Sequence, residues 1–458
     1  MLLSTWLMAK PFLAPMKKLI ACQLLLFALL ISVSCFSQNP FITSIYTADP
    51  SAHVWADGRL YVYPSHDIDP ARGCDLMDRY HVYSTDDMVN WRDEGEILNA
   101  SQVEWGRKEG GFMWAPDCAY RNGTYYYYFP HPSESKWNNS WKIGVATSKK
   151  PASDFTSAGY IKGIDSSSMI DPCVFIDTDG QAYFYFGGGS KCAGGKLKDN
   201  MVEIDGGMQK MEGLVDFHEA TWVFKRNGIY YLTYADNHGR ENQLRYATSN
   251  NPLGPWKYQG VFLGSTDCDT NHGSVVEYKG KWYMFYHNQN ISNTGHGNLR
   301  SICVDYVNFN DDGTIKLIEQ TKTGPAAIKA SKPNTKKATR YEAEKASLGG
   351  GATVNGNYVT NLKDAASYLT FLNINGGKKD GRATITITHA NTGYGRIKLL
   401  VNGADYSFLN AIATGDATAF TGKTVFTVKL NAGNNTIRLE GGGKDVVNVD
   451  YITITPLD

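Results

Sequence analysis

Hydrophobic and polar residues alternate in short runs, and one such pattern occurs five times between residues 48 and 287. Each copy has a polar residue, an apolar run, a turn with glycine and a run rich in aromatic residues. The copies span residues 48–63, 114–129, 170–186, 218–234 and 271–287. Alternation on both sides of a glycine-containing turn predicts an antiparallel hairpin in each copy. The turn glycines are Gly58, Gly123, Gly180, Gly228 and Gly280.

The distance between the copies leaves room for more strands in each unit. Residues 81–86, 142–148 and 244–250 alternate in the same way. Four-stranded units repeated around an axis form a β-propeller, so five copies predict five blades over residues 38–322. A last strand at residues 300–309 is expected to close the ring.

A second domain is predicted after the repeats. Residues 323–340 are rich in Lys, Pro, Ala and Thr, which is typical of a linker. Short alternating strands then predict a small β-sandwich of jelly-roll type over residues 341–458, and the whole chain is expected to be all-β. These strands are expected at residues 383–390, 396–403, 424–430, 436–442 and 446–455. The turn at Gly433–Asn435 is expected to form a hairpin.

The N-terminus has the features of an export signal. A basic pair at residues 17–18 precedes an apolar run over 19–33, so residues 1–37 are predicted to be a secretory signal, with Met16 as an alternative start. The apolar run is shorter than a comfortable membrane span of about 20 residues, and no second run follows it. The mature chain is therefore expected to be secreted or periplasmic. Anchoring through a lipid on Cys35 is the alternative.

Composition and charge narrow the classes of function. The 45 Lys+Arg and 45 Asp+Glu residues cancel, which argues against a nucleic-acid partner. The 28 Tyr and 10 Trp residues favour surfaces that stack on ring-shaped ligands. Eight cysteines without a C-x-x-C spacing exclude a zinc motif. Buried free thiols are favoured at Cys118 and Cys173, with one or two disulfides as the alternative.

The polar residue that opens each repeat carries the candidate chemistry. In a propeller these positions lie at one end of the central channel, so three carboxylates from separate repeats are predicted to meet there. Bringing like charges together costs free energy, which points to a function rather than to turn formation alone. The residues in register are Asp49, Trp114, Asp171, Glu219 and His272, and Asp117 lies out of register.

Two carboxyl groups that flank a glycosidic bond are sufficient to hydrolyse it. One must keep its proton for the leaving oxygen, and the other must be ionised to activate water. Crowding several carboxylates separates their pKa values in this way. The sequence has no G-x-S-x-G motif and no glycine-rich phosphate loop, which excludes two other classes of enzyme site.

The repeats resemble glycoside hydrolase family 43 over about residues 40–320. The matching motifs are YTADPSAHVW, MWAPD, IDPCVF, FHEATW and NHGSVV, in this order. The resemblance implies a five-bladed propeller that acts on glycans containing arabinose and xylose. It also implies that Asp49 is the general base, Glu219 is the general acid, and Asp171 orients the acid and tunes its pKa. The family inverts the anomeric carbon, so the carboxyl groups of Asp49 and Glu219 are expected about 6.5–9.5 Å apart.

Further roles follow from the same resemblance. His272 is expected to help hold a hydrated calcium or another ion in the channel, with a hydrogen-bonded core histidine as the alternative. Arg300 is expected near the sugar and the acidic residues, with a surface ion pair as the alternative. Trp114 is expected to stack on the sugar, and Asp117 is a further candidate for substrate binding.

The second domain resembles carbohydrate-binding module family 6 through YEAE near its start and NVDYITI near its end. This resemblance implies a structural calcium held by Glu342, Glu344 and Asp450. It also implies a sugar cleft that contains Tyr358 and Asn448.

The usual second aromatic residue of that cleft has no clear match. Phe420 lies nearest to the expected position, and residues 341–458 contain no Trp. A domain that only packs against the propeller is therefore the alternative to a sugar-binding one.

Together these features predict a secreted, monomeric, inverting exo-glycosidase that releases pentoses from plant cell-wall polysaccharides such as arabinoxylan or arabinan. The activity is expected to be that of an α-L-arabinofuranosidase or a β-xylosidase, with no cofactor for the chemistry and calcium only as a structural ion. Long segments at residues 64–81 and 131–142 are expected to wall a pocket, which favours exo over endo cleavage. The alternatives are an endo-acting xylanase or arabinanase and a non-catalytic glycan-binding protein.

Overall fold

The computed structural model describes residues 38–69, 75–164, 169–236, 241–292, 298–328 and 336–457. Almost all of its regular structure is β-strand, so the prediction of an all-β chain is confirmed. The described helices are single 3₁₀ turns: η1 (Ala100–Gln102), η2 (Trp137–Asn139) and η4 (Ala343–Lys345). Within the described ranges no helix has the length and apolar character of a membrane span. The predicted export signal, with Cys35, lies outside them.

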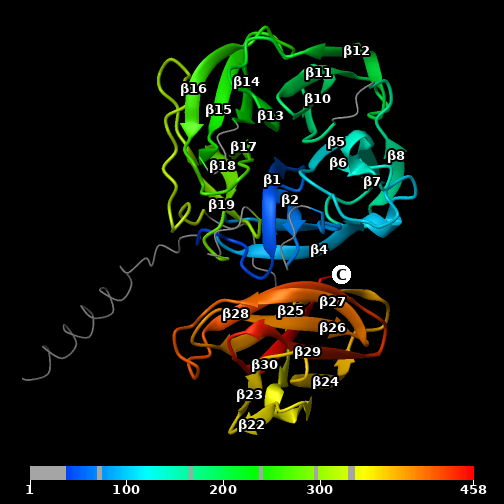
Figure 1. Ribbon diagram of the computed structural model, residues 1–458, viewed down its shortest axis with the longest axis vertical. Coiled ribbons are helices and arrows are strands. Elements are labelled where there is room, and N and C mark those ends of the chain that lie inside the picture. Colours follow the sequence, from blue (N-terminus) through cyan, green and yellow to red (C-terminus); the bar gives the residue numbers. More distant parts are fainter. Residues whose placement is uncertain are drawn as a thin grey trace, which may run out of the picture.

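Small antiparallel sheets form the first part of the chain and are arranged around a common centre (Figure 1). The described residues contain five of them, four with four strands and one with three, each in sequence order. The first two sheets contain β1 (Tyr46–Val54), β2 (Leu60–Asp67), β3 (Arg79–Thr85), β4 (Trp91–Asn99), β5 (Asp117–Arg121), β6 (Thr124–Pro132), β7 (Trp141–Ser148) and β8 (Thr156–Tyr160). The other three contain β9 (Cys173–Ile176), β10 (Ala182–Gly188), β11 (Lys191–Leu197), β12 (Ile204–Lys210), β13 (Glu219–Arg226), β14 (Ile229–Ala235), β15 (Leu244–Ser249), β16 (Lys257–Leu263), β17 (Ser274–Tyr278), β18 (Lys281–Asn288) and β19 (Ser301–Val307).

Every predicted repeat forms the first hairpin of one sheet. The turn glycines are needed for their backbone: Gly58 has φ +76°, and a Cβ atom there would touch nothing within 4 Å. The ring closes between its first and last sheets. Phe41 N–H donates to the Ile302 carbonyl (3.1 Å), and Thr47 N–H donates to the Arg300 carbonyl (2.9 Å). The strand expected to close the ring is therefore β19, the third strand of the fifth sheet.

The second part is a sandwich of two antiparallel sheets, as predicted. One sheet has the order β22-β23-β30-β25-β28, with β20 also paired to β30, and the other has the order β21-β24-β29-β26-β27. The strands are β20 (Thr339–Glu342), β21 (Ser347–Gly349), β22 (Thr353–Asn355), β23 (Tyr358–Leu362), β24 (Tyr368–Asn375), β25 (Gly381–Ala390), β26 (Gly395–Val401), β27 (Ala404–Ala411), β28 (Gly422–Leu430), β29 (Asn434–Lys444) and β30 (Val447–Pro456).

The expected hairpin at Gly433–Asn435 is wrong. The turn joins β28 to β29, but β28 pairs with β25, whereas β29 pairs with β24 and β26. The chain therefore crosses from one sheet to the other at this turn. Turn residues specify that the chain reverses, and burial of the inner faces decides which sheet receives the next strand.

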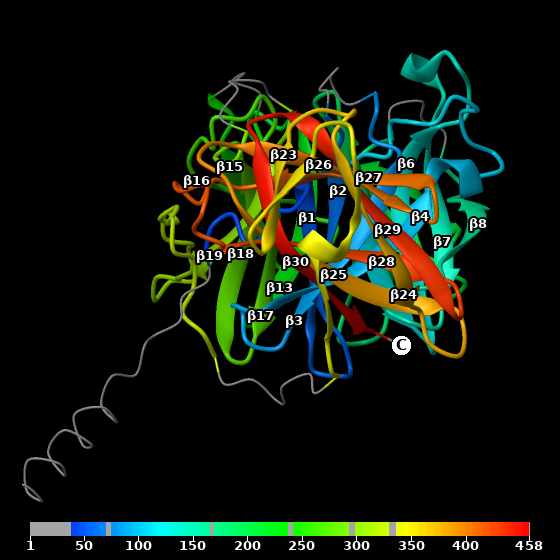
Figure 2. The ribbon, with the colours of Figure 1, turned by 90° about the horizontal axis from the view of Figure 1, so that it is seen from below.

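The sandwich packs closely against the first sheet of the ring, and Figure 2 shows it lying across the ring. One continuous apolar cluster contains Val62 and Tyr83 of that sheet together with Ile385 and Phe426 of the sandwich. Buried hydrogen bonds add to it: Thr427 N–H donates to Asp93 Oδ2 (2.8 Å), and Thr427 Oγ1 donates to the Asp93 carbonyl (2.7 Å). The second domain is thus an integral packing partner of the first blade.

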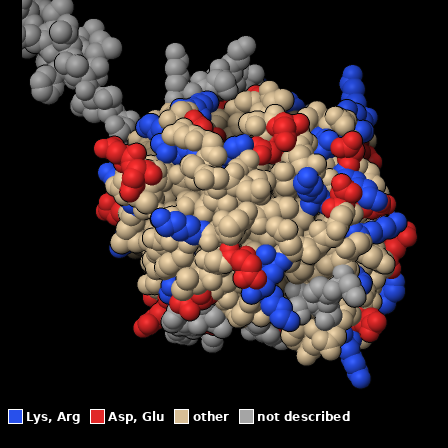
Figure 3. Space-filling model, turned by 90° about the horizontal axis from the view of Figure 1, so that it is seen from above, with Lys and Arg blue, Asp and Glu red and all other residues tan. Residues whose placement is uncertain are grey.

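The described cysteines are free and buried: Cys118, Cys173, Cys192, Cys268 and Cys303. This agrees with the predicted buried thiols at Cys118 and Cys173. Charges are mixed on the face shown in Figure 3, where Lys and Arg alternate with Asp and Glu around a mostly uncharged centre.

Candidate active site

Asp49 reaches the centre of the ring from β1 through a local irregularity. The pairing of β1 with β2 shifts register between Ala48 and Ser51, and Asp49 has φ +50°. Such bulges re-aim a side chain, and Asp tolerates positive φ better than most residues. The residue is 5% exposed, so its carboxylate lies in a nearly water-free environment.

Two donors and a histidine surround the Asp49 carboxylate. Ser65 Oγ donates to its Oδ2 (2.5 Å) and Arg300 Nη1 donates to its Oδ1 (2.9 Å). His287 Nδ1 accepts from Asp49 N–H (3.1 Å) and lies 3.6 Å from Oδ1. Burial alone would raise the pKa of Asp49. Arg300, His287, His272 and Ser65 together outweigh burial and lower this pKa to about 2. Asp49 is therefore ionised at neutral pH and suited to accept a proton.

Arg300 connects two buried carboxylates. Its Nε and Nη2 donate to the two oxygens of Asp67 (3.0 and 2.9 Å), while Nη1 donates to Asp49 and to Thr270 Oγ1 (3.0 Å). The side chain is buried, which excludes the surface ion pair considered as an alternative. Asp67 thus holds the guanidinium in the orientation in which it binds Asp49.

Several partners of Asp49 were not found from sequence. Ser65 and Asp67 lie in the last three residues of β2. His287 is the last residue of the fifth repeat and precedes Asn288, the last residue of β18. A signal was present, because each is a polar residue that follows a run of aromatic strand residues. The positions predicted from the repeat pattern, in contrast, open a repeat, and Arg300 was expected from the family resemblance.

Asp171 and Glu219 are joined through the backbone. Asp171 precedes β9 with φ +52°, and its Oδ2 accepts a hydrogen bond from Ala220 N–H (2.7 Å). Glu219 opens β13 at a second register shift, where Ala220 has φ +65°. The two bulged strands, β1 and β13, thereby direct carboxyl groups from the first and fourth sheets toward the channel.

Both members of the Asp171–Glu219 pair have raised pKa values. Burial and the charge of Asp49 raise the pKa of Glu219 to about 7, with Arg300 acting in the opposite direction. Burial and the charge of Glu219 raise the pKa of Asp171, while the hydrogen bond from Ala220 opposes this rise. That hydrogen bond stabilises the ionised form of Asp171. We therefore assign the shared proton to Glu219.

His272 lies between two of these carboxylates. Its Nδ1 is 3.9 Å from Asp49 Oδ1 and 3.8 Å from Asp171 Oδ2. Burial lowers the pKa of His272 to about 4, so the imidazole is neutral at neutral pH. Across the described ranges no three His, Cys, Asp or Glu side chains form a metal-binding group, so the predicted channel ion stays a prediction.

Asp117 has a different role from the one predicted. It is completely buried, and its carboxylate accepts hydrogen bonds from Ser51 Oγ (2.5 Å), His53 Nε2 (2.7 Å) and Val174 N–H (2.6 Å). These partners belong to β1 and β9, whereas Asp117 opens β5. Asp117 therefore joins three sheets instead of contacting a substrate, which agrees with its position out of register.

Trp114 belongs to an aromatic wall. Its ring lies 4.3 Å from that of Trp141 and 6.3 Å from that of Trp137, and Trp137 is 37% exposed. The predicted wall segment at residues 131–142 supplies both of these tryptophans. Tyr80 places the wall beside the carboxylates: its hydroxyl donates to the Trp114 carbonyl (2.7 Å), and after burial the charges of Asp49 and Asp171 raise its pKa further.

The predicted calcium ligands of the sandwich lie near one another. Arg340 Nη2 is 2.8 Å from Glu342 Oε2 and 3.8 Å from Asp450 Oδ1. Burial raises the pKa of Asp450, and the charges of Glu342 and Glu344 add to this rise. Glu344 Oε2 and Asp450 Oδ1 are buried without a hydrogen-bond donor.

The predicted sugar cleft of the sandwich is only partly available. The Tyr358 and Phe420 rings lie 5.0 Å apart, so an aromatic pair exists. The Asn448 side chain is buried, accepts from Thr360 Oγ1 (2.6 Å) and donates to the Ala417 carbonyl (2.7 Å). Its amide is thus used for internal hydrogen bonds.

Comparison with known families gives two matches. The profile of glycosyl hydrolases family 43 matches residues 37–315, and that of carbohydrate binding module family 35 matches residues 337–457. The resemblance of the second domain to family 6 is therefore wrong. Its motifs lie in β20, η4 and β30, where they build a strand pair and a carboxylate cluster and do not define a sugar-binding face.

Individual relatives cover the two parts differently. Xylosidase/arabinosidase 43A of Humicola insolens is 35% identical over 60% of this chain and 98% of its own. The structure of CoXyl43, a GH43 beta-xylosidase/alpha-arabinofuranosidase from a compost microbial metagenome, has 35% identity and a TM-score of 0.56 over 62% of this chain and 97% of its own. An arabinoxylan arabinofuranohydrolase of Bacillus subtilis has 25% identity and a TM-score of 0.55 over 93% of this chain and 99% of its own.

The raised pKa of Glu219 predicts how activity depends on pH. If Glu219 is the proton donor, the active form carries its proton, so kcat/KM should fall as pH rises through about 7. Asp49 stays ionised until pH approaches about 2, so it should cause no loss in the mildly acidic range. A pH–rate profile checks this, with the stability of the enzyme verified at each pH. An alkaline limb centred above about pH 9 would contradict the assignment of the proton donor.

Removal of the Arg300 charge should move both limbs of that profile. Arg300 lowers the pKa of both Asp49 and Glu219, so Arg300→Met should shift both limbs to higher pH. It also leaves Asp67 buried without its cation, which should cost about 3–5 kcal/mol of unfolding free energy, measured with urea. Arg300→Lys is the matched control: it keeps the charge and should give smaller pH shifts. Equal profiles for wild type and Arg300→Met would exclude the role assigned to Arg300.

Proposed function

Because this chain belongs to glycosyl hydrolases family 43, we propose that it is an inverting exo-glycosidase that releases terminal pentoses as an α-L-arabinofuranosidase or a β-xylosidase. The names of the relatives reported above refer to xylosidase or arabinosidase activity, and the matched region spans almost their whole length. One observation carries the proposal. Asp49 has a pKa near 2 and Glu219 a pKa near 7, and strands from the first and fourth sheets direct them to one channel.

The two carboxyl groups divide the reaction between them. Glu219 donates its proton to the glycosidic oxygen as the bond from that oxygen to the anomeric carbon breaks. Asp49 accepts a proton from a water molecule, which attacks the same carbon from the opposite face. After one turnover Asp49 is protonated and Glu219 is ionised, and exchange with solvent restores both. The predicted carboxyl separation of about 6.5–9.5 Å leaves room for this water.

Neighbouring residues support these roles. Arg300 keeps Asp49 ionised, and the negative charge of Asp49 helps to keep the proton on Glu219. Asp171 accepts a hydrogen bond from Ala220 N–H, directly beside Glu219. The aromatic wall around Trp114 offers a flat apolar surface for a sugar ring. The tryptophans of residues 131–142 stand beside it and favour a pocket that takes a chain end.

Plant cell-wall polysaccharides such as arabinoxylan or arabinan are the proposed substrates. Such polymers cannot enter a cell, which agrees with export directed by residues 1–37. Anchoring through Cys35 would place the enzyme on the outer surface instead. A purely glycan-binding protein would not need one ionised and one protonated carboxyl group in the same channel.

The proposal is tested with a panel of pentosides and ¹H NMR of the first product. Aryl β-xylosides and α-L-arabinofuranosides, xylo-oligosaccharides and arabino-oligosaccharides should yield single pentoses, and the sugar should first appear with the opposite anomeric configuration. A ladder of oligosaccharides would indicate endo cleavage. Release with the original configuration would contradict the role of Asp49 as a base.

The acid is tested separately with Glu219→Gln. The rate on oligosaccharides should fall by about 10²–10⁴-fold, because the leaving oxygen then receives no proton. The loss should be smaller for a dinitrophenyl pentoside, whose leaving group needs none. Glu212→Gln, a change at an exposed residue seven positions before Glu219, is the matched control and should keep full activity. An equal loss on both substrates would remove Glu219 from the role of acid.

We further propose that the sandwich binds one structural calcium ion through Glu342, Glu344 and Asp450, which lie near one another but do not already form a group of three metal ligands among the described residues. The buried oxygens of Glu344 and Asp450 that have no hydrogen-bond donor, and the raised pKa of Asp450, fit a cluster of carboxylates that Arg340 alone does not neutralise. Calcium would neutralise these carboxylates and hold β20 against β30. No step of the hydrolysis depends on it.

Calcium at 100 times its Kd should raise the unfolding free energy by about 2.7 kcal/mol, and EDTA should remove this gain. Glu344→Gln should abolish the calcium effect, whereas Glu241→Gln, an exposed change in the ring, should keep it. Equal melting temperatures of the wild type in calcium and in EDTA would contradict the site.

A further inference from the structure

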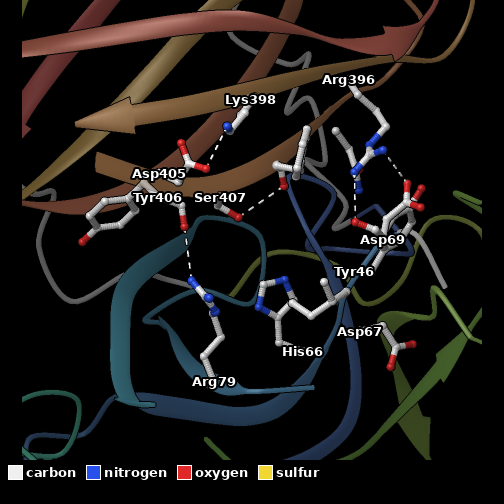
Figure 4. A pocket seen from close by; sticks show the side chains of 13 residues that line it. Tyr46, His66, Asp67, Asp69, Arg79, Arg396, Lys398, Asp405, Tyr406 and Ser407 are labelled. Atoms are coloured by element: carbon white, nitrogen blue, oxygen red, sulfur yellow. Dashed lines mark hydrogen bonds and ion pairs between the residues drawn. The ribbon is translucent and has the colours of Figure 1, made fainter. Parts of the chain in front are cut away.

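A second pocket lies where the sandwich meets the first sheet of the ring, away from the catalytic channel (Figure 4). Its volume is about 180 Å³. One wall comes from β1 to β3 and the segment after β2, and includes Tyr46, His66 and Ile68. The other comes from β26 and β27 of the sandwich. At about 30 Å³ for each water molecule in the liquid, the space suits one small molecule and not a polymer segment.

Three buried groups that line this pocket have no hydrogen-bond partner. They are His66 Nδ1, Arg396 Nε and Asn410 Nδ2, and these residues are 4%, 8% and 3% exposed. The Asn410 amide is oriented, because its Oδ1 accepts from the Tyr394 hydroxyl (2.7 Å). Arg396 Nε and Asn410 Nδ2 are donors, and His66 Nδ1 donates or accepts according to its tautomer. Buried polar groups in proteins are normally hydrogen-bonded, so these atoms around one space indicate a ligand with oxygen atoms and hydroxyl groups.

The charges around the pocket are already balanced. Arg396 Nη1 pairs with Asp69 Oδ2 (2.9 Å), and Lys398 Nζ pairs with Asp405 Oδ2 (2.8 Å). Arg79 pairs with Asp78 (2.8 Å). Asp67 also lines the pocket, but its carboxylate is bound to Arg300. A ligand therefore needs no net charge.

The lining also offers apolar surface and acceptors. Ile68 and Phe408, the latter 40% exposed, provide carbon surface for a ring. The Asp69 and Asp405 carboxylates can accept hydroxyl hydrogens in addition to their ion pairs. Oxygen atoms that accept, hydroxyl groups that donate and C–H faces that pack are together the properties of a sugar.

We propose that this pocket is a second sugar-binding site, built jointly by the ring and the sandwich, and that it takes one neutral sugar ring such as a free pentose. Asn410 and Arg396 donate to its oxygens, and Asp69 and Asp405 accept from its hydroxyls. The site does not depend on which glycosidic bond the channel cleaves, because none of the catalytic carboxyl groups lines it. Since the sandwich contributes Asn410 and Arg396 and the ring contributes Asp69, a bound sugar would hold the two domains together.

Crystals of the full-length protein soaked in xylose, arabinose or glucuronate test the proposal without any variant. A pentose should occupy the pocket with oxygens at Asn410 Nδ2 and Arg396 Nε. Water alone in the pocket at saturating pentose overturns the proposal. Glucuronate bound where pentoses are not would show an acidic ligand and overturn the neutral one.

Calorimetry of variants provides a second test in solution. Ser407 lines the pocket, so Ser407→Trp should fill it and remove one of two pentose-binding events, whereas Ser407→Ala should keep both. Identical titrations of the two variants would contradict the site. Loss of activity in the pentoside panel would leave this comparison unaffected, so the two proposals can fail separately.

Discussion

The buried arrangement of Arg300 between Asp67 and Asp49 is the interaction on which the rest of the site depends. Two carboxylates and one guanidinium in a nearly water-free space leave a negative charge on Asp49 that burial alone would not permit. Asp67 and Ser65 end the same strand, β2, and Asp49 lies on its partner, β1. The ionisation of the proposed base, Asp49, is therefore determined by residues of its own hairpin and by Arg300, which directly precedes β19 in the last sheet of the ring.

The same group of buried charges favours the protonated form of the proposed acid, Glu219. Burial and the negative charge of Asp49 disfavour an ionised Glu219. Burial and the charge of Glu219 act on Asp171 in the same direction. Positive φ values at Asp49, Asp171 and Ala220 show that the backbone leaves regular strand geometry where these groups meet. Irregular backbone of this kind is found at functional sites and is stabilised by the surrounding sheets. Asp117, which joins three sheets, provides part of that support.

The sandwich and the first sheet of the ring pack together as one unit. Its Thr427 binds Asp93 of β4, Arg396 binds Asp69 just beyond β2, and the apolar core runs through the contact. Asp69 lies two residues from Asp67, so the domain contact and the support of the base share one segment. The second domain also contributes one wall of the pocket at this contact, so it is part of the folded unit and not an independent attachment.

From sequence alone the hairpins, the all-β class and the axial positions Asp49, Asp171, Glu219 and His272 could be predicted, because alternation and turn glycines are local and repeat. The repeats also predicted that Trp114 and not Asp117 keeps the register. Tertiary structure alone decided that Arg300 is held by Asp67, that Asp117 joins sheets, and that the turn at Gly433–Asn435 changes sheet. It also decided that the two domains share a core. These features arise from contacts between residues up to several hundred positions apart, and burial selects such contacts only once whole sheets have packed.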